Sequence, residues 1–237
     1  MCMNGIVDNL RTIHQRIDGA LARCDRHHGD AKLMLATKMQ TVQTLRYTVG
    51  LGEHLFGENK VQELVPKVTE LYDLPITWHF IGHLQTNKVK DVVGRAVCVQ
   101  SVDRPSLVEA LQKECAKRDV HIDVMLEVNT SFEDSKHGSH PNDVARLVDV
   151  IAECPLLRVT GYMTIGANVD DERTVRKGFD MLRAIRDRYL PVMPAAKELS
   201  MGMSHDLEWA IAEGSTIVRV GTAIFGARSA TKESCNA

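Results

Sequence analysis

Two stretches in the last third of the chain have the residue types of a phosphate-binding site. They are Ser200-Met-Gly-Met-Ser204 and, one short predicted helix later, Val218-Arg-Val-Gly-Thr-Ala-Ile-Phe-Gly226. Small residues at the ends of two successive strands leave backbone N–H groups free and allow close backbone approach. Ser204 and Thr222 would supply hydroxyl groups where the next helices begin. We predict that these two loops hold a phosphate group; the alternative is a pair of tight turns with capping residues.

A lysine, Lys38, lies at the end of the first apolar run of the chain. Strand alternation places Lys38 on one face with Met34 and the small Ala36, which suits a crowded interior. Partial burial lowers the pKa of a lysine toward that of a reactive amine. Taken alone, Lys38 is also consistent with a lysine that reaches the rim as a salt-bridge partner. Beside a phosphate site, it favours pyridoxal 5′-phosphate (PLP) held as a Schiff base.

Arg219 lies between Val218 and Val220 on the last predicted strand and therefore faces opposite to both valines. An arginine that points into a barrel mouth needs a hydrogen-bond acceptor. The pyridine nitrogen of PLP would serve, and this contact would keep that nitrogen unprotonated and weaken carbanion chemistry. The alternative is a buried ion pair with a neighbouring carboxylate such as Glu198.

Three histidines, His54, His79 and His83, raise the question of a metal site. His79 and His83 are four residues apart, but they flank a predicted strand end and do not share one helix face. Carboxylates at other strand ends, Glu58 and Asp103, keep a metal-dependent barrel hydrolase as a third hypothesis. We expect no metal ligands.

Short apolar runs alternate with helical stretches after residue 30, which is typical of repeated strand–helix units and a parallel sheet. The eight predicted strands are Lys32–Lys38, His54–Gly57, Trp78–Gly82, Val97–Val102, Ile122–Val128, Arg158–Thr164, Glu198–Ser200 and Thr216–Gly221. Eight is the number that closes a (β/α)8 barrel. An open doubly wound sheet would need a glycine-rich turn after its first strand, and residues 37–41 contain no glycine.

An additional helix is predicted before the first strand, from Gly5 to about Arg26, because its apolar residues are three and four apart. The break at His27–Asp30 would end it, with Gly29 in the usual position after a helix. We therefore predict an α/β fold, a single (β/α)8 TIM barrel with an extra N-terminal helix. The barrel would span residues 1–228, and residues 229–237 would form a loose tail.

The composition excludes several classes of protein. The 237-residue chain is 44% hydrophobic and 25% charged, with a net charge of −2 and no run of basic residues. A dedicated nucleic-acid or membrane surface is therefore not expected. Six cysteines without a C-x-x-C pair argue against a zinc ribbon or a disulfide scaffold. Because we find neither a signal peptide nor a membrane-spanning run, we expect a reduced, cytoplasmic protein.

The same motifs carry a resemblance to a known family. The matching runs are Leu35-Ala-Thr-Lys38, Phe56-Gly-Glu-Asn-Lys-Val-Gln-Glu63, Trp78-His-Phe-Ile-Gly82, Leu84-Gln-Thr-Asn-Lys88, Ser101-Val-Asp103, Leu199-Ser-Met-Gly-Met-Ser204 and Gly214-Ser-Thr-Ile-Val-Arg-Val-Gly-Thr-Ala-Ile-Phe-Gly226. With these runs the chain resembles the pyridoxal phosphate homeostasis protein family, from its first strand to residue 228.

The resemblance implies a PLP-binding barrel like the N-terminal domain of alanine racemases, without their second β-domain. The implied cofactor-binding residues are Lys38, Asn59, Ser200, Ser204, Arg219, Gly221 and Thr222. Lys38 would form the Schiff base, and Arg219 would lie near the pyridine nitrogen. Ser204, Gly221 and Thr222 would surround the phosphate. Asn59 and Ser200 would line the pocket.

Three segments depart from the commoner family pattern. His83 stands where proline is expected, and Tyr162-Met-Thr-Ile and Asn129-Thr-Ser-Phe-Glu-Asp-Ser-Lys-His-Gly138 are variants of the usual segments. These departures leave the expectation of cofactor binding intact. They put a role for the loop Glu127–Gly138 in doubt.

We expect a non-catalytic PLP carrier that acts in intracellular PLP (vitamin B6) homeostasis and amino-acid balance. The alternative is a PLP-dependent racemase, which needs two bases on opposite faces of the substrate carbon. In alanine racemases the second base is a tyrosine of the second domain, and this chain ends where that domain would begin. The chain's own tyrosines are mostly in helical stretches: Tyr47, Tyr72, Tyr162 and Tyr189. We expect a monomer, with apo PLP-dependent enzymes as partners.

Overall fold

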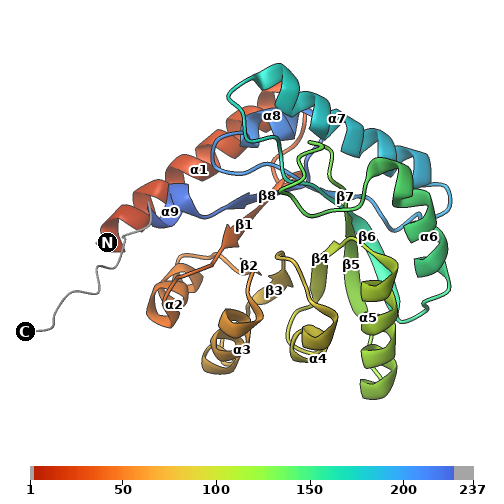
Figure 1. Ribbon diagram of the computed structural model, residues 1–237. Helices are drawn as coiled ribbons and strands as arrows, with labels where there is room; N and C mark the ends of the chain where they lie inside the picture. The colour runs from red at the N-terminus through yellow and green to blue at the C-terminus, as the bar shows by residue number, and fades with distance from the viewer. Residues whose placement is uncertain (1–2, 227–237) are drawn as a thin grey trace, which may run out of the picture.

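Eight parallel strands form a closed barrel in the computed structural model, which describes residues 3–226 (Figure 1). The strands are β1 (Lys32–Ala36), β2 (Leu55–Glu58), β3 (Thr77–Phe80), β4 (Cys98–Val102), β5 (Ile122–Glu127), β6 (Leu157–Met163), β7 (Glu198–Ser200) and β8 (Ile217–Val220). Each strand pairs with the next in chain order, and β8 closes onto β1. The predicted fold and all eight strands are confirmed. The predicted tail, residues 229–237, lies outside the described residues.

Helices surround the barrel and cover its outer face (Figure 1). They are α1 (Met3–Arg23), α2 (Val42–Gly50), α3 (Val61–Glu70), α4 (Val89–Val92), α5 (Pro105–Arg118), α6 (Val144–Ala152), α7 (Glu172–Tyr189), α8 (Leu207–Ala212) and α9 (Thr222–Phe225). Short 3-10 turns at Thr86–Lys88 and Pro141–Asp143 precede α4 and α6. Within residues 3–226, no helix combines the length and the apolar character needed to cross a bilayer.

The extra helix α1 takes the place of a full helix after the last strand. The helix that follows β8, α9, has only four residues, and α1 packs beside it and α8 (Figure 1). The Asn9 side chain donates to the Ile224 carbonyl at 2.9 Å, and Arg16 makes a two-pronged ion pair with Glu208. The predicted apolar stripe faces the barrel and is buried: Ile6, Leu10, Ile13, Ile17 and Leu21.

The apolar core has two layers, as strand alternation requires. The outer faces of the strands pack against the helices, with Leu35, Phe56 and Phe80 fully buried there. The inner faces pack around a small apolar plug inside the barrel, formed by Met34, Cys98, Met125, Met163 and Ile217. Because all eight strands are parallel, their carboxyl ends meet at one end of the barrel. We call the loops that leave this end the rim.

Candidate functional site

Lys38 lies at the rim, two residues beyond the end of β1. Met34, two positions before Ala36 on the same strand face, belongs to the plug inside the barrel. Lys38 is exposed, and its amine has no hydrogen-bond or ion-pair partner among residues 3–226. The salt-bridge alternative of the sequence analysis therefore finds no support in this part of the chain. An unpaired amine at the mouth is available to a ligand.

Both neighbours of Lys38 are fixed by one buried charge network. The Lys67 amine, on α3, donates to the Thr37 carbonyl at 2.8 Å, and Glu63 accepts from the Met39 backbone N–H at 2.7 Å. Lys67 also pairs with Glu58 at 2.6 Å and with Glu63 at 2.8 Å. Buried ions need such multiple partners to offset their loss of hydration. These hydrogen bonds hold the backbone on both sides of Lys38, and the Lys38 amine stays free.

Asn59 has an unsatisfied acceptor at the same end of the barrel. Its backbone N–H donates to the buried carboxylate of Glu58 at 2.8 Å, which fixes the residue directly after β2. Its side-chain oxygen Oδ1 is buried without a donor from residues 3–226. A buried acceptor without a partner costs free energy. Oδ1 is therefore suited to a donor on a bound molecule.

Arg219 points into the barrel, as predicted from alternation, and is only 5% exposed. Its guanidinium donates to the Ser200 hydroxyl at 2.6 Å and to the Thr164 carbonyl at 2.7 Å. Glu198, the alternative ion-pair partner, lies elsewhere and contacts Lys32 and Thr216. Burial lowers the pKa of Arg219 to about 10, against the opposing effect of nearby acidic groups. The guanidinium remains charged at neutral pH without a carboxylate in contact.

A chain of hydrogen bonds runs from Arg219 across the barrel. The Ser200 hydroxyl donates to the side-chain oxygen of Gln100 at 2.7 Å, and the Gln100 amide lies 2.9 Å from Nδ1 of His79. Burial lowers the pKa of His79 to about 4, so its ring is neutral at pH 7. With Nδ1 as the acceptor, every donor in the chain points the same way, away from Arg219. The chain fixes the guanidinium orientation beneath the rim.

The predicted phosphate residues come together beside the end of β1. The Ser204 hydroxyl accepts from the Ala223 N–H at 3.4 Å, and Thr222 begins α9 directly after Gly221. A Cβ on Gly221 would lie 2.9 Å from the Ala36 carbonyl oxygen, so the two strand ends nearly touch. These contacts bring the loops after β7 and β8 next to the turn that carries Lys38.

One detail of that prediction is wrong. Ser204 does not open the next helix, because α8 begins at Leu207 and Asp206 precedes it as the N-cap residue. The Asp206 carboxylate accepts from the Met203 N–H at 2.5 Å and closes the turn before the helix. Gly202, with a φ of +93°, makes the preceding bend. The Ser204 hydroxyl is therefore directed to α9 and not to its own helix.

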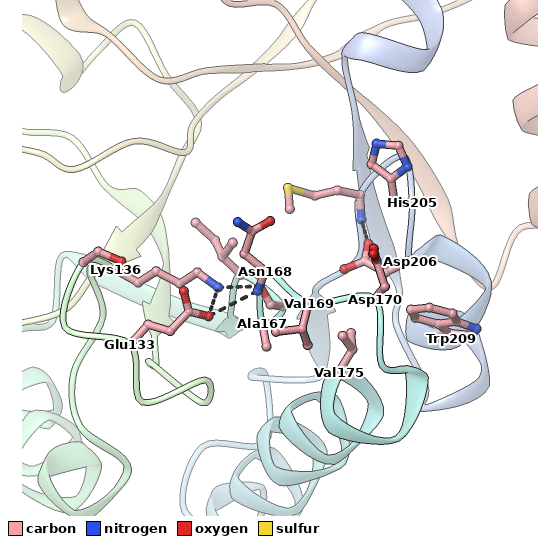
Figure 2. A pocket seen from close by; sticks show the side chains of 14 residues that line it. Glu133, Lys136, Ala167, Asn168, Val169, Asp170, Val175, His205, Asp206 and Trp209 are labelled. Atoms are coloured by element: carbon pink, nitrogen blue, oxygen red, sulfur yellow. Dashed lines mark hydrogen bonds and ion pairs between the residues drawn. The ribbon is translucent and has the colours of Figure 1, made fainter.

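A cavity of about 750 Å³ adjoins this turn (Figure 2). The loops after β5, β6 and β7 line it, and Figure 2 shows Asp206 and His205 on one side and Glu133 with Lys136 on the other. The Lys136 amine is already bound to Glu133 at 2.7 Å and to the Gly166 carbonyl at 2.6 Å. The cavity gives a ligand room beside the predicted phosphate loop. Lys38, not Lys136, is the free amine of the two.

The three histidines considered as metal ligands do not gather. His54 is exposed on the approach to β2, His79 faces the barrel interior, and His83 lies on the rim. Glu58 is part of the Lys67 network. Instead, His83 lies beside Asp103 and a residue that the sequence analysis did not single out, His137.

Sequence reasoning also missed two groups that shape the site. Lys67 follows Glu63 by four residues, a spacing at which two side chains pair on a helix, but its contact with Thr37 depends on the fold. Glu127, at the end of β5, is 3% exposed, and its pKa is raised to about 7 by burial and by Asp103. No local pattern marks a strand-end carboxylate as buried.

Comparisons with known proteins identify the family of this chain. The family model "Alanine racemase, N-terminal domain" matches residues 9–229. The pyridoxal phosphate homeostasis protein of Aquifex aeolicus is 41% identical over 225 residues, which are 93% of this chain and 97% of the relative. The protein of the same name from Escherichia coli K12 is 35% identical and covers 98% of this chain and all of the relative.

Solved structures with the same fold include PipY and alanine racemases. The crystal structure of an unknown protein from Bifidobacterium adolescentis is 36% identical, with a TM-score of 0.91, over 94% of this chain and 95% of that chain. PipY of Synechococcus elongatus, solved with PLP bound, is 30% identical, with a TM-score of 0.78, over 89% of this chain and all of that chain. The alanine racemase of Corynebacterium glutamicum, at 17% identity and a TM-score of 0.75, shares the fold over 64% of its length. The chain belongs to the pyridoxal phosphate homeostasis protein family, on the barrel of the alanine racemase N-terminal domain.

Proposed function

We propose that this chain binds PLP at the rim, through a Schiff base on Lys38, and that it acts in PLP homeostasis without catalysing a reaction. The observation that carries the proposal is the free Lys38 amine, on a turn fixed on both sides by Lys67 and Glu63. The PLP-bound structure of PipY, a relative at 30% identity, supports the choice of ligand.

The residues at the mouth match the parts of such a ligand. When bound, PLP supplies an aldehyde that a lysine amine can capture. Ser204, Gly221 and Thr222 offer hydroxyl and backbone N–H groups to a phosphate, which is the donor set that anions prefer. Neither Gly202 nor Gly221 has room for a Cβ. The unpartnered Asn59 Oδ1 would accept a hydrogen bond from the ligand.

Arg219 favours a binding role over catalysis. Its charge is held by Ser200 and the Thr164 carbonyl and is not neutralised by a contacting carboxylate. A guanidinium can only donate hydrogen bonds, so a ring nitrogen beside it stays unprotonated and the ring becomes a poor electron sink. We infer that the site holds its cofactor in a form of low reactivity.

The tyrosines of the described chain support the same inference. Tyr162 lies on the outer face of β6 in the buried layer beneath the helices, and Tyr47 and Tyr189 pack against that layer. Tyr72 is 86% exposed just after α3, at the barrel end opposite the rim. Within residues 3–226, no tyrosine is therefore placed to serve as the second base of a racemase.

The names of the relatives support a role in PLP (vitamin B6) homeostasis. We propose further that the chain influences amino-acid balance, works as a monomer in the cytoplasm and exchanges PLP with apo PLP-dependent enzymes. A cofactor site at an exposed rim suits such exchange, because the ligand can leave without unfolding of the barrel.

The test is the absorption spectrum of the purified protein with added PLP, before and after borohydride reduction. We expect a Schiff-base band and, after reduction, a mass increase on the peptide that contains Lys38. Lys38→Ala should lose both signals. Lys32→Ala is the matched control, since Lys32 lies on the same strand at the opposite end and is also exposed.

A band that persists in Lys38→Ala, with the mass increase on another peptide, would disprove the assignment of Lys38. A protein that never binds PLP would disprove the ligand. Incubation with L- or D-amino acids, followed by chiral analysis, tests the racemase alternative. Turnover that depends on Lys38 would replace the carrier proposal with an enzyme.

A further inference from the structure

Three potential metal ligands converge on the rim, away from Lys38. They are His83 after β3, Asp103 after β4 and His137 in the loop after β5, and one ligand atom from each lies within 4.8 Å of the other two. Nδ1 of His83 is 3.7 Å from Oδ2 of Asp103. The rings of His83 and His137 stack, with their centroids 4.1 Å apart.

Asp103 has one oxygen oriented and one available. Its Oδ1 accepts from Arg104 at 2.6 Å, and the same guanidinium donates to the Leu84 carbonyl at 2.6 Å. Oδ2 is the oxygen that faces His83. Metal-binding carboxylates are commonly held in this way by an outer hydrogen-bond partner.

The backbone at His83 is fixed on both sides. A Cβ on Gly82 would lie 2.1 Å from the Asn59 carbonyl oxygen, and the Gly82 carbonyl accepts from the Ser101 hydroxyl at 2.5 Å. Leu84, the next residue, is fully buried. The imidazole therefore projects from a rigid part of the loop.

His137 is fixed in the same manner. Lys136 before it binds Glu133 and the Gly166 carbonyl. Gly138 after it has a φ of +114°, and a Cβ there would lie 2.6 Å from the Asn129 nitrogen. Because the backbone beside both histidines is held, only their side-chain rotations have to be fixed when an ion binds.

The chemistry of the set selects the kind of ion. Two imidazoles and one carboxylate suit first-row transition ions better than Mg²⁺ or Ca²⁺, which prefer oxygen. Metal bonds of about 2.0–2.2 Å require the ligand atoms to move closer, which side-chain rotation allows for exposed rings. Three protein ligands leave a coordination position open.

We propose that His83, Asp103 and His137 form a binding site for a divalent first-row transition metal ion such as Zn²⁺. The site is separate from the Lys38 turn and does not depend on PLP. Gly82, the residue before His83, packs on the backbone of Asn59, which is a proposed PLP contact. The two proposed sites are therefore neighbours at the rim.

The test is a titration of the chelator-treated protein with Co²⁺, followed by visible absorption, and then with Zn²⁺ in competition. We expect one equivalent to bind, with the d–d bands of nitrogen and oxygen ligands and without a thiolate charge-transfer band. His83→Asn and His137→Asn should each weaken the affinity at least tenfold, because loss of even an outer partner weakens metal sites by about 10- to 100-fold. His121→Asn is the control: this histidine is exposed directly before β5, at the other end of the barrel.

Two further measurements make the result decisive. Lys38→Ala should bind Co²⁺ as the wild type does, which separates this proposal from that for PLP. Far-ultraviolet circular dichroism should show that the exposed histidine variants are folded. Unchanged Co²⁺ binding in the double variant His83→Asn/His137→Asn, a thiolate band in the wild type, or the absence of saturable binding would each overturn the proposal.

Discussion

The two sides of the rim solve the problem of holding a ligand in different ways. The glycine side consists of the turn at residues 37–41 and the loops at 201–206 and 221–222, and it presents backbone N–H groups, hydroxyls and the amine of Lys38. The histidine side consists of the loops at 81–88, 103–104 and 128–143, and it presents imidazoles and a carboxylate. The first side suits an anion, and the second suits a cation.

The two sides differ in which atoms must be placed precisely to hold a ligand. On the glycine side, backbone N–H groups would themselves contact the ligand, so the backbone positions at residues 202 and 221 matter directly. On the histidine side, the ligand atoms are at the ends of side chains, and the backbone only has to aim them. One barrel end can therefore carry two sites of opposite charge preference, each built by adjacent loops.

The largest expected effect concerns the buried carboxyl of Glu127, at the base of the histidine side. Its pKa in the folded protein is about 7, compared with the ordinary value of 4.5. Between pH 4.5 and 7 the unfolded chain releases this proton first, so the free energy of unfolding falls as the pH rises, by about 3 kcal/mol in all. Glu127→Gln should match the wild type near pH 4.5 and be about 3 kcal/mol more stable at pH 8.

Urea unfolding at pH 5 and pH 8 checks this result. His79, held neutral with a pKa of about 4, has the opposite effect, because stability is lost as the pH falls from 6.5 towards 4. That contribution is present in both proteins and cancels in their difference. Glu153→Gln, on an exposed residue, serves as the control. A Glu127→Gln protein with the same pH dependence as the wild type would contradict the prediction.

The next largest effect on stability should come from Gly82→Ala, which disturbs the contact between Gly82 on the histidine side and the backbone of Asn59. The added Cβ would lie 2.1 Å from a backbone carbonyl oxygen, so the backbone must move. We expect a loss of about 2–3 kcal/mol in the free energy of unfolding, as for overpacking in a core. Gly50→Ala is the matched control, since no atom lies within 4 Å of its Cβ position. Equal stability of the two variants would show that the contact between residue 82 and the Asn59 backbone can accommodate a Cβ.

Gly221→Ala tests the close approach on the glycine side. The new Cβ would meet the Ala36 carbonyl oxygen at 2.9 Å and the Ala36 Cβ at 3.2 Å, a milder conflict than at Gly82. We expect a loss of about 1 kcal/mol, together with weaker PLP binding in a spectroscopic titration. Loss of stability with unchanged PLP affinity would remove Gly221 from the phosphate site.

The smallest effect should belong to Ser204→Ala. The hydroxyl accepts one long hydrogen bond of 3.4 Å, so thermal unfolding should hardly change. If the hydroxyl contacts a phosphate, its loss should weaken inorganic phosphate binding about threefold, or about 0.7 kcal/mol, as one donor among several. Thr12→Ala, on the exposed face of α1, provides the comparison. Identical phosphate affinity in the two variants would argue against a role for Ser204.

The two sides also differ in how well a sequence predicts them. The residues of the glycine side come from two contiguous sequence motifs and a lysine at a strand end, so the sequence shows them directly. Strand alternation alone predicts that Arg219 faces the barrel interior, where it is buried. The histidine side needs residues 83, 103 and 137 to meet, and that meeting depends on loop conformations such as the positive φ of Gly138. From the sequence, nothing groups His83 and Asp103 with His137, and no metal ligands are expected.

Helix ends were the other weak point, for a local reason. The first helix ends at Arg23, a few residues before the predicted end, because Asp25 takes the left-handed conformation (φ +52°) directly after it. Gly29 also has a positive φ (+91°) but lies farther along the chain. Asp and Asn adopt that conformation more readily than most residues. The Arg26 N–H then reaches the Leu21 carbonyl at 3.0 Å and closes the helix. Composition near a helix end leaves several residues able to do this.

The place of α1 in the ring has a consequence for how the protein is made. Asn9 and Ile224, which are hydrogen-bonded, are 215 residues apart in the chain. At synthesis rates of about 5–20 residues per second, α1 leaves the ribosome on the order of 10–40 seconds before its partners exist. During that time α1 lacks α8 and α9, the two helices against which it packs in the folded protein. The last strand and the first helix thus complete the ring together, and a nascent chain has no finished barrel until both are present.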